Sequence, residues 1–590
     1  MKKRLIYLCA LVFVVLSCGE DFAETTQVGD VSIETLSNPQ GVSLLLTGAY
    51  SALDGVRNNL SGNGFAISGD NWWCDVMSDD AHKGSTDGDQ VELFQLETNV
   101  INTSNGFFEG RFSAIFSGVN RANATLDLIR NINLDALTTD EIEAIGNQEA
   151  EAYFLRAHYN FELTKMWGNV PFISVDNFAD QDFNQPNLGP LWDQIEEDFQ
   201  FAIDNLPNSQ DDPGRPTVGV ARAYLGKVHL YQQEWTQALT ELMTVINSGE
   251  FSLASEYLDN FTASGENGPE SVFAIQFAVD GGLSLNGNQG STLNFPGGAP
   301  FDSCCGFYMP TIDLANAFIV DGTTGLPNNL DGALDFPTDY NIPSFETDAD
   351  GNILEDANGD PIPTPFTPDM TTPVDPRLDY TVGRRGIDYN GFGEHVGMSW
   401  IRTPPTDISG VYLPKKNVYQ ANELGNNQGT GEWGQQHSGV NYNIIRYADV
   451  LLFAAEAAVE TGDLALALSL TNQVRARAQN STPVQAIDGG GPAANYIVGL
   501  YPSFPSIEFA REAVRFERRV ELGMEGHRLF DLRRWGVATE VLTRYYTNEA
   551  RTITNFGVKV GSYNSTFDLF PIPVNAVDIS QGVLTQNPGY

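Results

Sequence analysis

An aromatic pair stands on a short polar stretch of the sequence, Asn71-Trp72-Trp73-Cys74-Asp75, whose side chains could bind a small polar ligand. Indole rings can cover the C–H faces of a sugar ring, and amide or carboxylate groups can hydrogen-bond to its hydroxyl groups. Glycine and aspartate crowd the residues that follow, as is typical of a loop. We therefore predict that Asn71, Trp72, Trp73 and Asp75 belong to a binding site, with core packing as the alternative for either tryptophan.

Four more aromatic candidates lie in a stretch rich in Gly, Pro, Asn and Asp, roughly 265–442. Loops carried on a rigid scaffold are where binding residues tend to lie. Trp400 and Trp433 are far from any helical pattern, and Phe307 and Tyr308 closely follow Cys304-Cys305. We add these four aromatic residues to the candidate site. Two other tryptophans, Trp192 and Trp235, lie in helical patterns and are expected to pack.

Three cysteines occur beyond the N-terminal segment: Cys74, Cys304 and Cys305. Outside the cytoplasm disulfides persist, so Cys74 could bridge to one of the pair and staple two candidate loops together, or the adjacent pair could join. Free buried thiols are the third alternative. The sequence has no CxxC motif or His/Cys cluster, and we expect no structural zinc site.

Two similar turns, at 348–352 and 356–360, repeat the pattern Asp-x-[Asp/Asn]-Gly-[Asn/Asp]. Oxygen ligands at alternate positions suit calcium, but an EF-hand loop needs its glycine at the sixth position. We favour two solvated turns of a hairpin and expect no other cofactor. The calcium candidates are Asp348, Asp350, Asp356 and Asp360.

The sequence carries no familiar catalytic motif: it lacks a Gly-x-Ser-x-Gly elbow, a P-loop and a His-Glu-x-x-His pattern. A glycoside hydrolase would need two carboxylates about 5 to 10 Å apart. The 76 acidic residues could supply such a pair, but neighbours such as Asp79-Asp80 are more simply read as solvated loop residues or hydroxyl acceptors. We expect a binding protein rather than an enzyme.

The net charge of -44 argues against a nucleic-acid partner, because phosphate binding needs a basic face. Arginines do gather between Arg511 and Arg534, but seven arginines and five acidic residues leave that window with a net charge of only +2. We predict a packed helix whose guanidinium groups bridge carboxylates of neighbouring elements. Residues three apart, Arg518 with Glu521 and Arg528 with Asp531, lie on one helix face and can pair.

Apolar residues recur at helical spacing in six segments, most of them in the first 250 residues. These segments are 39–53, 107–129, 140–166, 191–206, 217–247 and 445–478. The last two break near 232–234 and 461–463, so each predicts a helical hairpin. Small residues twelve apart, Gly226 with Ala238 and Ala455 with Ala467, match the close helix contact of tetratricopeptide hairpins.

The N-terminus has the pattern of an export signal, with Lys2, Lys3 and Arg4 before an apolar run that is too short to span a bilayer. The stretch from Val15 to Cys18 resembles a bacterial lipobox. We predict that residues 1–17 are removed and that Cys18 is acylated, so that lipid anchors the chain to a membrane. Gly19-Glu20-Asp21 resembles the signal that directs lipoproteins of Bacteroidota to the outer face of the outer membrane.

Several motifs occur in a fixed order along the chain: Tyr153–Phe161 with Trp167–Pro171, 191–206, Asp375-Pro-Arg377, Ile445–Leu452 with Ala455-Glu-Ala457, 516–536, and Phe570–Pro573 with Asn587–Tyr590. Together they resemble the SusD/RagB family of outer-membrane nutrient-binding lipoproteins. The resemblance covers nearly the whole chain, and it implies packing roles for Trp167 and Trp535, which stand in these motifs.

The resemblance implies a mainly α fold, in which tetratricopeptide-like hairpins form a scaffold with a large loop-rich insertion carrying short strands. It implies one domain from 18 to 590, with the scaffold at about 38–255 and 443–590 and the insertion at about 265–442. It further implies a non-catalytic lipoprotein on the cell surface that captures oligosaccharides and delivers them to a SusC-like TonB-dependent transporter. The negative charge favours a neutral glycan such as a β-glucan. A peptide-binding tetratricopeptide-type scaffold is the alternative, and a glycoside hydrolase is the least favoured.

Overall fold

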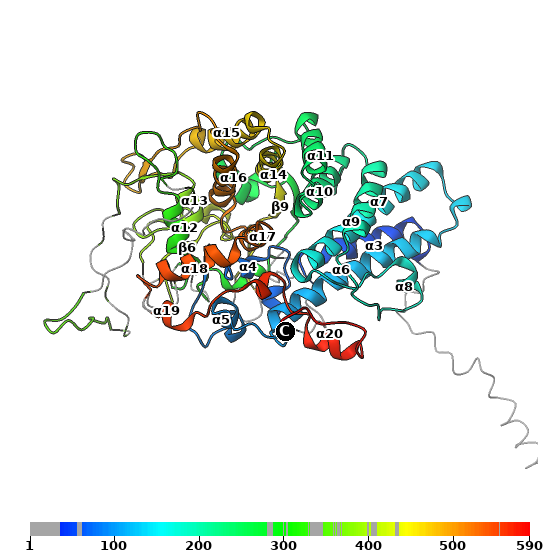
Figure 1. The fold of residues 1–590 in the computed structure, drawn as a ribbon, viewed down its shortest axis with the longest axis horizontal. Coiled ribbons are helices and arrows are strands. Elements are labelled where there is room, and N and C mark those ends of the chain that lie inside the picture. Colours follow the sequence, from blue (N-terminus) through cyan, green and yellow to red (C-terminus); the bar gives the residue numbers. More distant parts are fainter. Residues whose placement is uncertain are drawn as a thin grey trace, which may run out of the picture.

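The computed structural model describes residues 36–55, 62–279, 287–298, 300–301, 305–328, 330, 346–357, 359, 362, 366, 368–397, 400–402, 410–430, 436–553 and 555–590. The fold is mainly helical, as predicted, and its longer helices form an arc beside a loop-rich region (Figure 1). The predicted signal segment and Cys18 lie outside the described residues. Within the described part of the chain, no helix combines the length and hydropathy that a membrane span requires.

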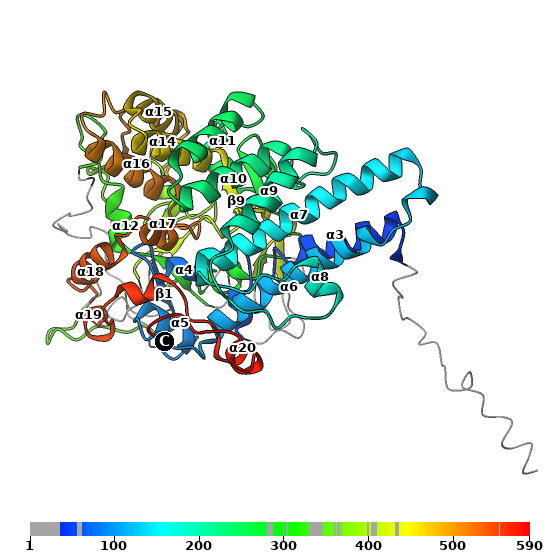
Figure 2. The same cartoon turned by 45° about the vertical axis from the view of Figure 1, so that its right-hand side comes forward.

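The helices of the arc confirm the periodicity in the sequence, including both predicted breaks. They are α3 (Pro39–Ser51), α6 (Gly106–Arg130), α7 (Thr139–Trp167), α9 (Trp192–Asn205), α10 (Val218–Tyr231), α11 (Trp235–Ser248), α14 (Tyr447–Glu460) and α15 (Leu464–Asn480). Packing runs from α3 and α6 through α7 and α9 to α10 and α11, and then to α14 and α15 (Figures 1 and 2). The helices therefore pair in chain order, each pair against the next.

Side-chain caps fix where several of these helices begin. Thr138 and Glu141 form a reciprocal capping box at the start of α7, and the Asn105 side chain accepts from the Phe107 N–H at the start of α6. The Asp463 side chain caps α15 directly after the Thr461-Gly462 turn. These caps satisfy backbone donors that the first helical turn leaves without partners.

A small residue is required where α10 crosses α11. A Cβ atom built on Gly226 would lie 2.7 Å from Leu242 Cγ and 3.5 Å from the Ala238 carbonyl oxygen. Ala238 and Leu242 are themselves fully buried. The twelve-residue spacing of Gly226 and Ala238 thus marks a close helix contact, as predicted.

Paired strands join two loop-rich parts of the chain, residues 62–105 and the insertion, to each other and join the insertion to the segment that follows it. Strand β1 (Ala81–Gly84) pairs antiparallel with β3 (Phe307–Pro310), and β2 (Ser271–Ile275) pairs antiparallel with β9 (Tyr442–Arg446) through a bulged register. Shorter pairs are β4 (Pro373–Val374) with β10 (Asn495–Tyr496), β5 (Val382–Gly383) with β6 (Leu413–Pro414), and β7 (Gln428–Thr430) with β8 (Gln436–Ser438). The segment 62–105 is thus a second irregular excursion, inside the range predicted as helical scaffold.

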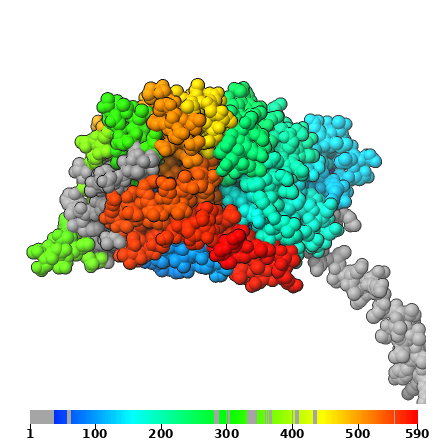
Figure 3. Space-filling view, in the orientation of Figure 1, coloured from blue at the N-terminus to red at the C-terminus, as the bar shows by residue number. Residues whose placement is uncertain are grey.

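The remaining helices are short or follow the last hairpin. They are α4 (Trp72–Asp75), α5 (Val91–Glu97), α8 (Val175–Ala179), α12 (Ile312–Ala317), α13 (Leu378–Thr381), α16 (Ile507–Leu522), α17 (Arg528–Arg534), α18 (Ala538–Glu549), α19 (Phe556–Lys559) and α20 (Val574–Ile579). In Figure 3 the C-terminal segment, drawn in orange and red, covers the lower front of the molecule above the blue N-terminal excursion. The Asn99 amide donates to the Gly561 carbonyl at 2.9 Å across this junction.

The arginine-rich segment is packed, as predicted, but its ion pairs differ from the predicted ones. Arg518 donates to Asp449 at 2.6 Å and to Asp531 at 3.0 Å, and Arg528 donates to Asp79 at 2.8 Å. Neither arginine pairs with the acid three residues along the chain. The prediction of pairs within one helix was wrong, because packing places carboxylates of other elements, Asp449, Asp531 and Asp79, against these guanidinium groups.

Candidate functional site

An open groove of about 420 Å³ lies where the end of α3 meets the α9–α10 loop and the exit of β2. Its volume falls in the range of small-molecule binding sites, about 300 to 1,000 Å³. The lining residues are Thr47, Tyr50, Ser51, Leu53, Asp54, Asp212, Pro213, Gly214, Arg215, Ala274, Ile275, Gln276 and Ala278. The groove therefore combines an aromatic ring with amide, guanidinium and carboxylate groups.

Tyr50 and Arg215 form the charged wall of this groove. The guanidinium lies over the Tyr50 ring, 5.4 Å from its centroid, and donates to Glu151 Oε2 at 2.7 Å and to Asp212 Oδ2 at 3.1 Å. The Tyr50 hydroxyl donates to the same Glu151 oxygen at 2.6 Å. Burial raises the pKa of Tyr50 well above its usual value, with the Glu151 carboxylate adding to the effect, so the hydroxyl stays a donor.

Burial also raises the pKa of the Glu151 carboxyl, against the opposing effects of Tyr50 and Arg215. The Glu151 side chain is almost completely enclosed on α7, whereas Arg215 and Asp212 are partly open to solvent. A buried carboxylate thus holds a tyrosine and an arginine at the groove wall, and Asp212 remains available to accept hydrogen bonds from a ligand.

The amide side chain of Gln276 forms another part of the groove wall, where the chain leaves β2. Gln276 is exposed, and its carbonyl oxygen accepts from Asn267 Nδ2 at 2.9 Å and from Asn441 Nδ2 at 2.8 Å. Its own amide donates back to Asn267 Oδ1 at 3.0 Å. Gly214 allows the α9–α10 loop to pack closely on Gln276, because a Cβ atom there would lie 2.6 Å from Gln276 Cγ. Fixed amide groups of this kind can read the hydroxyl pattern of a sugar.

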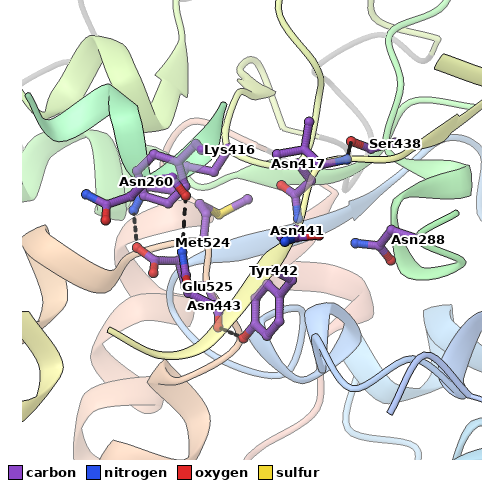
Figure 4. A pocket seen from close by; sticks show the side chains of 12 residues that line it. Asn260, Asn288, Lys416, Asn417, Ser438, Asn441, Tyr442, Asn443, Met524 and Glu525 are labelled. Carbon is purple, nitrogen blue, oxygen red and sulfur yellow. Dashed lines mark hydrogen bonds and ion pairs between the residues drawn. The ribbon is translucent and has the colours of Figure 1, made fainter. Parts of the chain in front are cut away.

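Figure 4 shows a second, narrower pocket. One of its lining residues, Asn441, donates to Gln276 of the groove. Its volume of about 30 Å³ admits water but not a sugar ring. Lys416 and Glu525 close one end with a 2.7 Å ion pair, and the Tyr442 hydroxyl donates to the Glu525 carbonyl oxygen at 2.5 Å. The asparagines around it are Asn260, Asn288, Asn417, Asn441 and Asn443.

A third depression, of about 460 Å³, lies between the end of α15 and the loops around β5 and β6. Tyr380, Asp388, Asn390, Lys415 and Gln485 are among the residues that line it. Lys415 Nζ is already engaged, since it donates to the carbonyl oxygens of Asp379 at 2.6 Å and of Asp388 at 2.9 Å. We place the candidate site in the first groove, where polar groups on two walls face one open volume.

The predicted aromatic pair does not lie at a surface. Trp72 is 1% exposed and Trp73 is 0% exposed, and both pack edge-on against Phe107. Trp72 Nε1 donates to the Phe65 carbonyl oxygen at 2.9 Å. A buried ring offers no face to a sugar, so the alternative of core packing describes both tryptophans in this structure.

The polar neighbours of that pair are buried as well. Asn71 Nδ2 donates to Glu162 Oε2 at 3.0 Å, and Asp75 Oδ2 accepts from the Tyr308 hydroxyl at 2.7 Å. Burial raises the pKa of Asp75 to about 8, and the nearby Asp80 adds to this rise. The structure thus brings Asp75 and Tyr308 together, but inside the core rather than in a binding loop.

The other aromatic candidates share this placement where they are described. Phe307 and Tyr308 are fully buried in the main core, and Trp400 is 4% exposed in a second cluster with Phe301 and Tyr389. Trp433 lies outside the described residues. The insertion therefore uses Trp400 for a small hydrophobic core of its own.

The pair Asp79-Asp80 was wrongly expected to be solvated. Both side chains are buried and receive Arg519, whose Nη2 is 3.0 Å from Asp79 Oδ2 and whose Nε is 2.9 Å from Asp80 Oδ1. Burial opposes ionisation of Asp79, but Arg519 and Arg528 hold its pKa well below its usual range. These carboxylates contribute ion pairs to the core.

The cysteines do not staple the two predicted loops. Cys74 is a free, buried thiol, and burial raises its pKa far above the usual value, which leaves it unreactive. Cys305 is disulfide-bonded, and Cys304 lies outside the described residues. A bridge from Cys74 to either of them is therefore excluded in this structure.

Asp348, one of the calcium candidates, shapes a turn. Its Oδ1 accepts from the backbone N–H groups of Asp350 and Asn352, both at 2.9 Å, and its Oδ2 accepts from Asn352 Nδ2. These are the hydrogen bonds of a solvated turn, the alternative favoured by the sequence. Asp350 lies exposed in this turn, Asp356 lies exposed at the start of the next turn, and Asp360 lies outside the described residues.

Sequence reasoning missed the groove residues because they come from three distant segments. Tyr50 ends a helix, Arg215 follows a Pro-Gly turn between two helices, and Gln276 follows a strand. The one available signal was Pro213-Gly214-Arg215-Pro216, a loop that joins consecutive hairpins at the end of the scaffold.

Paired helices in an arc, with a loop-rich insertion and an open polar groove beside it, define a helical-hairpin binding scaffold. Residues 269–590 match the family model described as SusD family, and because this is more than half of the chain, the protein belongs to the SusD family. Residues 56–230 match a second model, described as starch-binding associating with outer membrane. The family is associated with the outer membrane, and its glycan-binding proteins are non-catalytic, so the chain is not expected to be an enzyme.

Known relatives extend over the full chain. SusD-like protein P25 of Formosa agariphila is 24% identical over 608 residues, covering 100% of this chain and 99% of that protein. Among solved structures, a laminarin binding SusD-like protein is 23% identical with a TM-score of 0.64, covering 94% of this chain and 100% of that one. Surface glycan-binding protein A of Bacteroides thetaiotaomicron, in complex with laminarihexaose, is 18% identical with a TM-score of 0.62, covering 93% and 99%.

Proposed function

We propose that the protein captures a neutral oligosaccharide of the β-glucan class at the cell surface and passes it to a SusC-like TonB-dependent transporter without chemical change. The observation that carries the proposal is the open groove between Tyr50, Arg215 and Gln276 on a SusD-family scaffold. Its aromatic, amide and carboxylate groups match what a sugar offers, namely C–H faces and hydroxyl groups.

The net charge and the relatives support a neutral ligand. A chain of net charge -44 repels a polyanionic polysaccharide at long range. Two structures of the same fold are described as binding laminarin or holding laminarihexaose. The predicted acylation of Cys18 would keep the groove at the membrane surface, where a transporter could receive the ligand.

Calorimetric titration of the chain from Gly19 onward tests glycan binding, with laminarin, an α-glucan and the polyanion alginate as ligands. We expect laminarin to bind and alginate not to bind. Gln276→Ala and Asp212→Asn alter solvent-accessible groove side chains and should each weaken binding at least about tenfold. The first removes hydrogen bonds to hydroxyl groups, and the second removes the negative charge that strengthens them. Arg222→Lys is the matched control, since Arg222 pairs with Glu241 at 2.6 Å outside the groove.

Two results would count against the proposal. Equal laminarin affinity in all four proteins would move the site away from the groove, and no affinity for any neutral glycan would remove the ligand class. Delivery is tested separately, by capturing the acylated chain from outer membranes. Capture that recovers no TonB-dependent transporter would contradict the second half of the proposal.

A further inference from the structure

Three metal-binding side chains meet at the turn between α10 and α11. Glu196 comes from the first turns of α9, His229 from the last turn of α10, and Glu234 from the residue before α11. His229 Nδ1 lies 2.7 Å from Glu234 Oε2 and 3.9 Å from Glu196 Oε1. The nitrogen and oxygen atoms of these three side chains that could bind a metal all lie within 4.8 Å of one another. Among the described residues, no other three His, Cys, Asp or Glu side chains come together in this way.

These separations fit a small divalent ion. Zinc binds histidine nitrogen and carboxylate oxygen at about 2.0 to 2.2 Å, so tetrahedral ligand atoms are about 3.4 Å apart. The observed distances of 2.7 and 3.9 Å lie on either side of that value. The ligand atoms of all three side chains lie within 4.8 Å of one another, so rotation of the two carboxylates is the movement that would bring them to coordinating distance.

The charge of the cluster also favours a cation. The buried carboxylates Asp79, Asp80 and Glu151 pair with arginines, but among the described residues no lysine or arginine is within 4.0 Å of Glu196 or Glu234. The basic side chain beside the two carboxylates is the imidazole of His229, which hydrogen-bonds to Glu234 at 2.7 Å and lies 3.9 Å from Glu196. A divalent ion would balance both carboxylates, in a protein whose overall field already attracts cations.

The surrounding contacts hold the ligands in place. Gln232 Nε2 donates to Glu196 Oε1 at 2.5 Å, a support that ligating carboxylates commonly receive. The Glu234 N–H donates to the His229 carbonyl oxygen at 2.8 Å, which closes the turn and fixes the spacing of the two residues. The side chains are 12%, 31% and 39% exposed for His229, Glu196 and Glu234, so an ion can reach them from solvent.

We propose that Glu196, His229 and Glu234 bind a divalent transition metal, with Zn²⁺ as the best match, and leave a coordination position open to water. One nitrogen and two carboxylates suit zinc, whereas calcium takes six to eight oxygen ligands. The site is separate from the groove, because α10 runs from the groove end at Val218 to His229, about 17 Å at 1.5 Å per residue. Sequence spacing gave no hint, since the ligands are 33 and 5 residues apart along the chain.

Zinc titration of the metal-stripped chain from Gly19 onward tests this proposal, by calorimetry and by competition with a chromogenic chelator. We expect one equivalent of Zn²⁺ to bind, and Ca²⁺ at the same concentration not to displace it. Glu196→Gln, Glu234→Gln and His229→Gln should each weaken Zn²⁺ binding at least about tenfold, since each removes one ligand. Glu241→Gln, on the same hairpin but paired with Arg222, should bind Zn²⁺ like the unaltered chain.

Thermal unfolding separates ligand loss from misfolding. Zn²⁺ should raise the unfolding midpoint of the unaltered chain and of Glu241→Gln, but not that of Glu196→Gln or Glu234→Gln, because only a bound ion stabilises the folded state. If His229→Gln is unfolded in the presence of chelator, the two glutamate variants alone test the proposal. Both alter partly exposed side chains and should therefore remain folded. Unchanged Zn²⁺ affinity in either glutamate variant, or an equal loss in Glu241→Gln, would overturn the proposal.

Discussion

The Arg377 guanidinium donates to Glu521 Oε2 at 2.7 Å, between two side chains that are almost completely buried. The other Glu521 oxygen accepts from Arg446 at 2.5 Å and from Arg477. Burial opposes ionisation, but these three cations hold the pKa of Glu521 well below its usual range. One carboxylate on α16 therefore connects a loop of the insertion with β9 and α15.

Replacing this carboxylate should destabilise the fold strongly. In Glu521→Gln, three buried guanidinium groups lose a shared counter-charge, and breaking a buried pair on one side costs about 3 to 5 kcal/mol. Chemical denaturation at pH 7 measures the loss. The control is Glu460→Gln. Glu460 pairs with Arg511 at 2.6 Å, and because this pair is partly exposed, its loss should cost only about 0 to 1 kcal/mol. Similar losses in both variants would contradict a special role for Glu521.

The same network explains which parts of the fold the sequence predicted well. The motifs Asp375-Pro-Arg377, Ile445-Arg446 and 516–536 are far apart in the chain, yet their side chains meet around Glu521. Helical periodicity located the scaffold helices because it is a local signal. The ion-pair partners were not predictable, because spacing within one helix says nothing about the carboxylates that packing brings from elsewhere.

Stability should fall at alkaline pH because of one buried histidine. His82 lies between Glu97, at 3.0 Å from Nδ1, and Glu549, at 2.7 Å from Nε2. Burial disfavours the imidazolium, but hydrogen bonds to Glu549 and Glu97 outweigh it and raise the pKa of His82 to about 9. Because the pKa is higher in the folded state, protonation of His82 stabilises the fold fully at pH values below its unfolded pKa of about 6.5. This contribution is lost as the pH rises through the folded pKa of about 9.

His82→Gln isolates this contribution. The difference in unfolding free energy between the unaltered chain and the variant should be largest near pH 6 and smaller by about 3 kcal/mol above pH 9, because one pKa unit corresponds to about 1.4 kcal/mol. Other titrating groups largely cancel in this difference. Denaturation curves at pH 6, 7.5 and 9.5 provide the measurement, and a difference that does not vary with pH would show that His82 is not charged in the folded protein.

The close approach of α10 and α11 predicts that a larger side chain destabilises the protein at Gly226 but not at Gly146, a glycine of another helix. Gly226→Val would place atoms against the buried Leu242, and such overpacking costs about 1 to 3 kcal/mol. Gly146→Val on α7 is the control, because no atom lies within 4 Å of a Cβ built there and the helix propensities of the two residues differ by only a few tenths of a kcal/mol. Thermal unfolding of both variants is the test. Equal midpoints would show that the α10–α11 contact can widen freely.

The binding site was harder to predict than the scaffold for a physical reason. Residue type tells that a tryptophan can stack on a sugar, but not whether its face is open to solvent. The excursion at 62–105 looks like a surface loop in the sequence, yet its α4 lies in the core against Phe107. Tyr50, Arg215 and Gln276 meet only after three distant segments have folded, so no local pattern marks them.

Trp73 should therefore matter for stability and not for ligand recognition. Its ring packs against Phe107, Phe108 and Phe570, and Trp73→Ala should cost about 3 to 5 kcal/mol. At a temperature where the variant remains folded, its laminarin affinity should equal that of the unaltered chain, whereas Gln276→Ala should keep its stability and lose affinity. Unfolding curves and calorimetric titrations on the same preparations measure both quantities. A Trp73→Ala protein that keeps its unfolding midpoint but no longer binds laminarin would show that the tryptophan pair, and not the groove at Arg215, recognises the glycan.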